Sequence, residues 1–261
     1  MFKGKFFNLP MKLPKLIFTV LGDGQFTRFH YKYLYTIWNL AWYRNLARYR
    51  RTHLGSLWIG FTNLLQVSVF AFVYGVVFKV PSFKDFFIYL GFGITIWTFM
   101  GGCVSSFSQL FINERNRLLN FSGSIYDILA EEYTFHIQVF LQSLGMLLVV
   151  LYFVDGSIIK NTLSSFLPLI CMGVGVFAIS IIISIISAFI KDLAQIIPVI
   201  LNLLFLTSPI MYPKEALGNL DFVPRFNLLY FYLDPLRNTF INGEINYLNN
   251  LILLIISIIF L

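Results

Sequence analysis

The stretch NTLSSFLPLICMGVGVFAISIIISIISAFI, residues 161–190, contains no charged side chain and few polar ones. A helix needs ~20 apolar residues to cross the hydrocarbon core of a bilayer, so this stretch is long enough to span a membrane. Five further uncharged runs repeat the pattern: Leu57–Phe78, Phe86–Asn113, Tyr133–Val154, Leu193–Pro213 and the shorter Ile245–Leu261. We therefore predict an all-α polytopic membrane protein with six transmembrane helices, which moves or senses something across a bilayer.

The composition agrees with this fold class. Hydrophobic residues make up 58% of the chain and charged residues 12%, whereas a soluble domain has about 25% charged residues. The net charge is +7, but the basic residues lie beside the predicted spans. Membrane lipids with anionic headgroups are therefore the expected partner of this charge, and we predict no nucleic-acid binding.

The distribution of Lys and Arg predicts the orientation of the chain. Thirteen of these residues lie in the N-terminal arm and in the connections after the second and fourth runs, against six on the opposite side. Because cytoplasmic loops carry the excess of positive charge, we predict a cytoplasmic N-terminus and, with six spans, a cytoplasmic C-terminus.

Residues 1–56 are predicted to form a cytoplasmic arm and an interface helix, ahead of a transmembrane domain at residues 57–261. From about Phe26 to Asn45, apolar residues recur at spacings of three and four, among them Tyr33, Ile37 and Leu40. This pattern predicts an amphipathic helix, and its aromatic content favours a position in the cytoplasmic membrane interface. The alternative is a cytoplasmic helix that packs on a partner protein.

The connection at residues 114–132 is predicted to contain a short helix with one apolar edge, which ends at the Ser-Gly-Ser sequence of residues 122–124. Glu131 and Glu132 are expected to open the third span, where carboxylates interact favourably with the helix dipole.

The connection at residues 214–244 is rich in aromatic residues and contains two prolines, Pro224 and Pro235, expected to interrupt it. A re-entrant pair of half-helices before the last span, sheltered by protein, explains such a composition better than a solvated loop. The alternative is a segment that lies flat on the outer leaflet.

The sequence contains no Walker A motif, no His-Glu-x-x-His motif and no pair of carboxylates inside a run. His136 is the one ionisable group near the middle of a run, and a packing role is the ordinary explanation for it. Ion-coupled transporters usually place acidic groups at this depth. We therefore expect no cofactor in this chain, and an energy source in a partner protein.

Three segments carry a resemblance to a known family. The first is RYRRTHLGSLW, residues 48–58, at the entrance to the first span. The second is Lys191–Leu193, followed by LTSPIMYP at residues 206–213, and the third is LLYFYLDPLR at residues 228–237. Together they resemble ABC-2-type transporter permeases, in particular the subgroup that exports O-antigen, capsule and teichoic-acid polysaccharides.

The resemblance implies an assembly. Such permeases have six spans and pair with a second copy and with two ABC ATPase subunits, which bind the ATP and Mg²⁺. They are multi-pass proteins of the bacterial inner membrane. A coupling helix between the second and third spans docks in the ATPase, and the N-terminal helix is a second contact. In this chain the coupling segment corresponds to Asn113, Glu114, Arg115, Asn116, Arg117, Leu118, Leu119 and Phe121.

Two further sets of residues are candidates for contact with cargo. Arg48, Arg50 and Arg51 would meet a lipid pyrophosphate at the cytoplasmic entrance, although simple positive-inside anchoring explains them equally well. Aromatic faces stack on the C–H faces of pyranose rings, which suits a sugar conduit, whereas lipid contact is the ordinary role of most aromatics in a span. The candidate conduit residues are Tyr89, Phe92, Trp97, Phe99, Tyr212, Tyr230 and Phe231.

The function predicted on these grounds is export of an undecaprenyl-linked polysaccharide by an ATP-driven transporter, in which this chain is the permease and not an enzyme. One alternative is an ABC-2 permease for a small hydrophobic drug or lipid. Another is a membrane-embedded glycosyl or acyl transferase, which the absence of paired acidic residues in any connection disfavours.

Overall fold

The computed structural model describes residues 25–77, 80, 82–120, 124–156, 158–212, 214 and 222–260. Every element within these ranges is helical, as predicted. The α-helices are α2 (Gln25–Arg48), α3 (Leu57–Val77), α4 (Phe83–Asn113), α5 (Arg115–Asn120), α6 (Ile125–Val154), α7 (Ile158–Ser164), α8 (Phe166–Phe189), α9 (Leu193–Thr207), α10 (Tyr230–Asn242) and α11 (Tyr247–Phe260), and η2 (Val223–Phe226) is a 3₁₀ helix.

Four of these helices are long and apolar enough to cross a membrane: α3, α4, α6 and α8. The fifth and sixth predicted spans correspond to α9 and α11, of 15 and 14 residues, which are shorter than the ~20 that a perpendicular span needs. The multi-pass membrane protein is therefore confirmed, and the count of six spans stays a prediction.

Helix α9 ends earlier than the uncharged run because of Pro209. A residue before proline avoids the helical region, and Ser208 accordingly has an extended backbone with ψ of 146°. The next residues, up to Tyr212, are not helical, and Pro213 lies outside the described residues. By contrast Pro198 and Pro235 lie within α9 and α10, so the expectation that Pro235 interrupts its segment is wrong.

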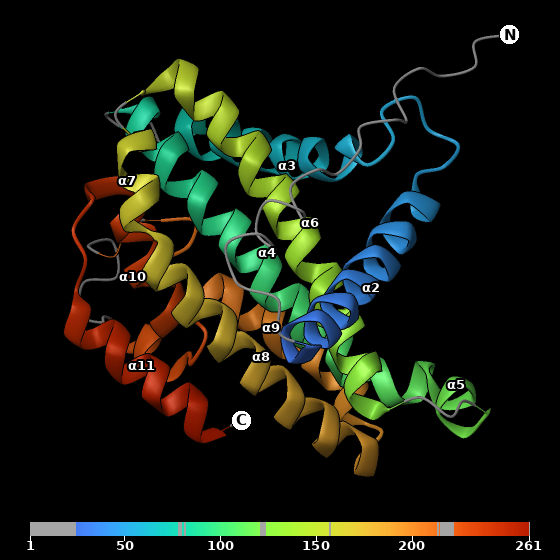
Figure 1. The fold of residues 1–261 in the computed structure, drawn as a ribbon. Helices are drawn as coiled ribbons and strands as arrows, with labels where there is room; N and C mark the ends of the chain where they lie inside the picture. Colours follow the sequence, from blue (N-terminus) through green and yellow to red (C-terminus); the bar gives the residue numbers. More distant parts are fainter. Residues whose placement is uncertain are drawn as a thin grey trace, which may run out of the picture.

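Helix α4 is the centre of the bundle, and it packs against α3, α6, α8, α9 and α10 (Figure 1). In its most apolar stretch 72% of the residues are buried, against 28% for α3, 33% for α6 and 39% for α8. The outer helices thus present apolar side chains such as Phe72, Phe153 and Phe189, which are 65%, 81% and 85% exposed. This pattern is that of helices whose outer faces contact lipid or a second protein surface.

The predicted N-terminal helix is present as α2, and it packs on α6 (Figure 1). Its inner face holds the buried residues Ile37, Ala41 and Asn45, while Leu34 and Tyr43 remain 65% and 67% exposed. The Asn45 side chain donates to Gln138 Oε1 at 2.9 Å, and Gln138 Nε2 donates to the Trp38 carbonyl at 2.8 Å. Helix α2 therefore has one face fixed on the bundle and another that is free for the membrane interface or a partner.

Helix α6 begins at Ile125, about two turns before the predicted span. Ser124 caps it, since Ser124 Oγ accepts from the Tyr126 N–H and Asp127 Oδ2 accepts from the Ser124 N–H. Asp127 is thus the acid in the first turn, and the expectation that Glu131 and Glu132 lie at the helix N-terminus is wrong. Their side chains instead bind residues of other helices.

The aromatic connection at residues 214–244 is largely helical where it is described. It forms η2 and then α10, which packs against α4, α7 and α8. Gly243, with a left-handed φ of 76°, ends α10, and its N–H donates to the Thr239 carbonyl. The first piece is a four-residue 3₁₀ helix and the second has 13 residues, and the predicted re-entrant pair stays a prediction.

Candidate functional site

The predicted coupling segment forms a separate short helix, α5, which projects from the bundle at the end where α2 crosses α6 (Figure 1). Arg117 fixes this helix, because its Nη2 donates to Glu131 Oε2 at 2.7 Å and its Nη1 lies 3.7 Å from Glu114 Oε2. The hydrogen bond to the Glu131 carboxylate raises the pKa of the Arg117 guanidinium. Leu118 packs against buried apolar residues of α4 and α6, which include Leu110.

The remaining members of the coupling segment are placed differently. Asn113, Arg115 and Asn116 are exposed, and Glu114 is half-buried as the residue after α4. The side chain of Leu119 and the whole of Phe121 lie outside the described residues. The segment therefore has an inner side, fixed by Arg117 and Leu118, and an exposed side with polar groups.

A polar cavity of about 360 Å³ lies beside this segment, between α2, α4 and α6. Its lining includes basic, acidic and hydroxyl side chains: Arg44, Arg48, Ser105, Ser106, Gln109, Asn113, Glu132 and His136. Arg48 of the predicted entrance set belongs to this lining, whereas Arg50 and Arg51 are exposed in the turn between α2 and α3.

Glu132 is the centre of the interactions around this cavity. Its side chain is 5% exposed and lies 2.5 Å from Arg44 Nη1 of α2. Ser106 of α4 also donates its hydroxyl to Glu132, and His136 Nε2 is 3.4 Å from Glu132 Oε1 without the alignment of a hydrogen bond. A buried carboxylate is stable only with such partners, so Glu132 joins α2, α4 and α6.

Aromatic contact strengthens the attachment of α2. The Arg44 and Arg48 guanidinium carbons lie 4.1 Å and 5.2 Å from the centre of the Phe135 ring, within the range of cation–π attraction. Tyr33 donates its hydroxyl to Asp127 Oδ1 at 2.7 Å, and burial together with this hydrogen bond raises the pKa of Tyr33 to about 12.

The four candidate conduit aromatics of α4 lie inside the helical bundle. Tyr89 donates its hydroxyl to the Pro209 carbonyl at 2.7 Å, and Phe92 is fully buried and stacked on Phe240. Trp97 is 8% exposed and Phe99 4% exposed. In this conformation these rings hold α4 against α6, α9 and α10.

The other three conduit candidates lie after α9 and in α10. Tyr230 is buried, Tyr212 is half-buried and Phe231 is 44% exposed. The structure thus brings Tyr230 near Tyr89 around a shared cation, Arg237, and leaves Phe231 at the surface.

Arg237 was counted in the sequence as one charge on the outer side and as the last residue of the segment LLYFYLDPLR, without a predicted role in packing. It is 1% exposed, and its guanidinium carbon lies 3.9 Å from the centre of the Tyr89 ring. It donates to the Pro209 carbonyl at 2.9 Å and to Asp234 Oδ1 at 2.8 Å. Arg237 therefore ties α10 to α4 and to the turn after α9.

A signal for this cluster was present in the sequence. Tyr230, Asp234 and Arg237 are spaced by four and three residues, which places their side chains on one face of a helix. Tyr230 donates its hydroxyl to Asp234 Oδ1 at 2.9 Å, as this spacing allows. The pattern was missed because Pro235 was expected to interrupt the helix.

Within the described part of the chain, no group of three or more His, Cys, Asp and Glu side chains could hold a metal ion. Cys103 and Cys171 are buried free thiols. The clusters at both ends of the bundle consist of ion pairs and hydrogen bonds between helices, an arrangement suited to holding helices together and to transmitting their movement.

Comparison with known proteins agrees with this architecture. The profile of the ABC-2 type transporter family matches residues 35–241, from within α2 to the end of α10. The chain is also 24% identical, over 211 residues, to the O-antigen export system permease protein RfbA of Klebsiella pneumoniae, covering 77% of this chain and 78% of that protein. With four apolar helices of spanning length, a projecting α5 and a family match over most of its length, this chain belongs to the ABC-2 type transporter family.

Proposed function

We propose that this chain is the permease subunit of an ATP-driven exporter that moves a lipid-linked polysaccharide from the cytoplasmic to the outer face of a bacterial inner membrane. The observation that carries the proposal is α5, a short helix with exposed polar residues that is fixed to the long helices α4 and α6. The similarity of the chain to a permease for O-antigen export favours a polysaccharide as the cargo.

In this proposal α5 is the coupling helix. Two ATPase subunits, which hold the ATP and Mg²⁺, serve two copies of this chain, and each presses on one α5. The ion pair between Arg117 and Glu131 passes that force into α6. At the next residue of α6, the Glu132 cluster passes it on to α2 and α4, so a push at one point moves three helices together.

The proposed cargo path begins at the cavity between α2, α4 and α6. Arg48 lines it, and Arg50 and Arg51 lie in the turn that follows, so cations are present where a lipid pyrophosphate would arrive. The competing role for these cations is anchoring to anionic lipids.

The proposed sugar path ends at the aromatics near α10. Tyr212 and Phe231 expose ring surface in this conformation and are the members of the set that a passing glycan would touch first. Tyr89, Phe92, Trp97, Phe99 and Tyr230 would reach a conduit only when α10 moves relative to α4, in an open state.

Two measurements test the proposal. The tagged chain is purified gently from its native membrane, and the co-purifying proteins are identified by mass spectrometry. We expect an ATPase with a Walker A motif in about equal amount. In parallel, deletion of the chromosomal copy should abolish surface display of a polysaccharide, with lipid-linked material retained in the cytoplasm. Unchanged surface polysaccharide would refute the cargo, even where an ATPase co-purifies.

A second function, export of a small hydrophobic drug or lipid, has one observation in its favour. A cavity of about 290 Å³ lies between α8, α10 and α11 and is lined almost entirely by apolar side chains, such as Ile179, Ile183 and Ile256. If this is the function, deletion should change resistance to hydrophobic compounds and leave surface polysaccharide intact.

A further inference from the structure

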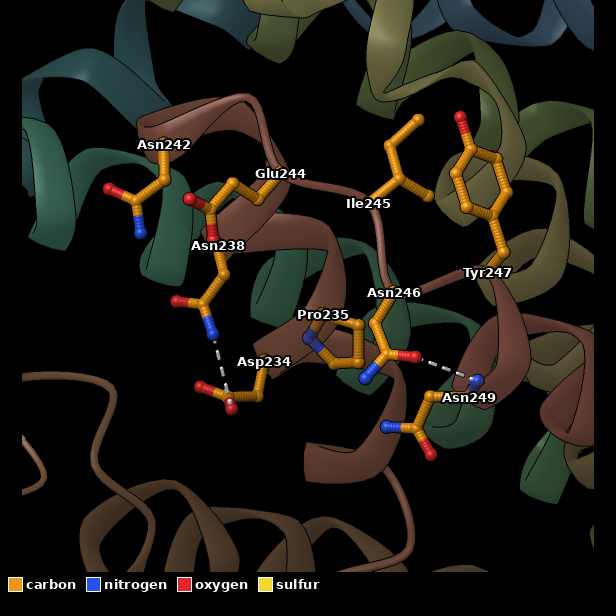
Figure 2. A pocket seen from close by; sticks show the side chains of 9 residues that line it. All are labelled: Asp234, Pro235, Asn238, Asn242, Glu244, Ile245, Asn246, Tyr247 and Asn249. Atoms are coloured by element: carbon orange, nitrogen blue, oxygen red, sulfur yellow. Dashed lines mark hydrogen bonds between the residues drawn. The ribbon is translucent and has the colours of Figure 1, made fainter.

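A polar groove of about 650 Å³ lies beside the C-terminal half of α10 and the start of α11 (Figure 2). In the bundle, α10 and α5 lie on opposite sides (Figure 1). The side chains of the groove come from α10, from the connection after it and from the first turn of α11. Six of them carry an amide or a carboxylate: Asp234, Asn238, Asn242, Glu244, Asn246 and Asn249.

Most of the hydrogen-bonding capacity in this groove is unused. The side chains of Asn242 and Glu244 are exposed and bond to no other residue in the described part of the chain. Asn238 donates to Asp234 Oδ2 at a long 3.4 Å, and Asn246 Oδ1 accepts from the Asn249 N–H, which caps α11. An amide can donate twice and accept twice, so several donors and acceptors remain for a ligand.

The groove is held in shape by contacts beneath it. Asn161 of α7 donates to the carbonyls of Phe240 and Ile241 at 3.1 Å and 3.0 Å, which satisfies the open end of α10. Arg237, near the middle of α10, holds the helix against α4. A site that needs little rearrangement loses less free energy when a ligand binds.

The chemistry of the lining selects a class of ligand. Sugar hydroxyls both donate and accept, which matches a mixed row of amides and carboxylates. The Tyr247 ring, 64% exposed, and Pro235 supply flat apolar surface for the C–H face of a pyranose ring. Asp234 and Glu244 would repel a phosphate group, so the lining disfavours an anionic lipid headgroup or a nucleic acid.

We propose that this groove binds a neutral, hydroxyl-rich segment of the exported glycan on the outer face of the membrane. The inference rests on the proposed function, which supplies the glycan and the outward orientation. A filled groove at the exit would hold the emerging chain and oppose its return.

Asp234 is unsuitable as the test residue, because its Oδ1 also holds the buried Arg237 and Tyr230. Asn242→Ala and Glu244→Gln remove groups that have no partner among the described residues. Lys160→Ala of α7 is the matched control, since Lys160 is exposed near the same end of the bundle and does not line the groove.

The experiment uses the full chain in lipid nanodiscs. The probe is surface polysaccharide released by mild acid from the strain that encodes the protein, and binding is followed by isothermal titration calorimetry. We expect the combined Asn242→Ala and Glu244→Gln variant to bind at least tenfold more weakly, and Lys160→Ala to bind like the parent. Equal binding by the parent and the combined variant, or no binding to the parent, would overturn the proposal.

A second pair of measurements separates glycan binding from cation binding and from misfolding of the variant. The protein is also titrated with CaCl₂. If it binds Ca²⁺ tightly but not the glycan, and Glu244→Gln loses the Ca²⁺ binding, the groove is a cation site and not a glycan site. In intact cells, an impermeant maleimide should label the cysteine of Glu244→Cys from outside, and added polysaccharide should protect this cysteine from labelling. This measurement tests the groove even if the combined variant does not fold. Absence of outside labelling, or labelling that polysaccharide leaves unchanged, would contradict the inference.

The two proposals can fail separately. If deletion of the chain leaves surface polysaccharide intact, the proposed function is wrong. If deletion abolishes display but the groove variants bind and display polysaccharide normally, only the groove inference is wrong.

Discussion

The two members of the ion pair between Glu132 and Arg44 differ in their exposure to solvent. The Glu132 side chain is 5% exposed, whereas that of its partner Arg44 is 39% exposed. A charge left unpaired in the interior costs far more free energy than one that can turn towards water. Two substitutions that remove this same contact should therefore differ in their cost to the free energy of unfolding.

We expect Arg44→Gln to lower the free energy of unfolding by about 3 kcal/mol, because it removes the guanidinium that neutralises a buried carboxylate. Glu132→Gln should cost about 1 kcal/mol, since Arg44 can turn outward. The double variant should resemble Glu132→Gln. Chemical unfolding of the purified protein in detergent measures all three, and a larger cost for Glu132→Gln would contradict the assignment.

Tyr33 provides a pH-dependent contact at the same scale. The fold raises the pKa of Tyr33 from 10.0 to about 12, through burial and the hydrogen bond to Asp127. The fold therefore favours the neutral phenol. Its contribution to stability is complete below pH 10 and is lost as the pH rises through 12. The difference in melting temperature between the parent and Tyr33→Phe should shrink between pH 9 and pH 12; a constant difference would contradict this contact.

At the scale of elements, the close approach of α3 and α6 depends on one glycine. A Cβ added at Gly60 would lie 2.8 Å from the Gln142 carbonyl oxygen and 2.9 Å from Met146 Cβ. Backbone and a Cβ cannot move aside as the end of a flexible side chain can. The two helices would have to separate, which costs the packing along their whole contact.

Gly60→Ala should therefore destabilise the protein by about 1–3 kcal/mol. Gly145→Ala is the matched control on α6, because a Cβ there meets nothing within 4 Å, and alanine favours helix over glycine. Thermal unfolding followed by tryptophan fluorescence compares the two variants. Similar losses from both would show that α3 and α6 do not meet at Gly60.

The sequence predicted the elements better than their partners, for a physical reason. An uncharged run is a local property, so α3, α4, α6 and α8 could be located directly from it. The ends of helices were less certain, since α6 starts early at a capping box and α9 stops early at Pro209. Both signals are short and easily overlooked beside a long apolar run.

Contacts distant in sequence were beyond such reasoning. Arg44 and Glu132 are 88 residues apart, so nothing local indicates that one neutralises the other. The burial of Arg237 likewise depends on Tyr89 and Pro209, which come from other parts of the chain. The coupling segment was predictable as a short helix with one apolar edge, because polar residues there interrupt two apolar runs. The ion pair of Arg117 with Glu131, which fixes the helix, was not predicted.

At the scale of the whole molecule, α5 is the point at which a partner would act on the bundle. Arg115 and Asn116 are exposed and bond to no other residue in the described part of the chain, whereas Arg117 is bonded to Glu131. Exposed side chains without partners contribute little to stability, typically less than ~0.5 kcal/mol. Substitutions within α5 should therefore distinguish residues that contact the ATPase from residues that stabilise the helix.

We expect the combined Arg115→Ala and Asn116→Ala variant to keep the melting temperature of the parent and to lose at least tenfold in surface polysaccharide. Arg117→Ala should lower both, with a stability cost of about 1–2 kcal/mol for the lost charged hydrogen bond. Quantitative staining of surface polysaccharide and thermal unfolding in detergent compare the variants at equal membrane content. If the combined variant displays polysaccharide at the parental level, force does not enter through α5, and the exposed face of α2, with Leu34 and Tyr43, becomes the place to search for the ATPase contact.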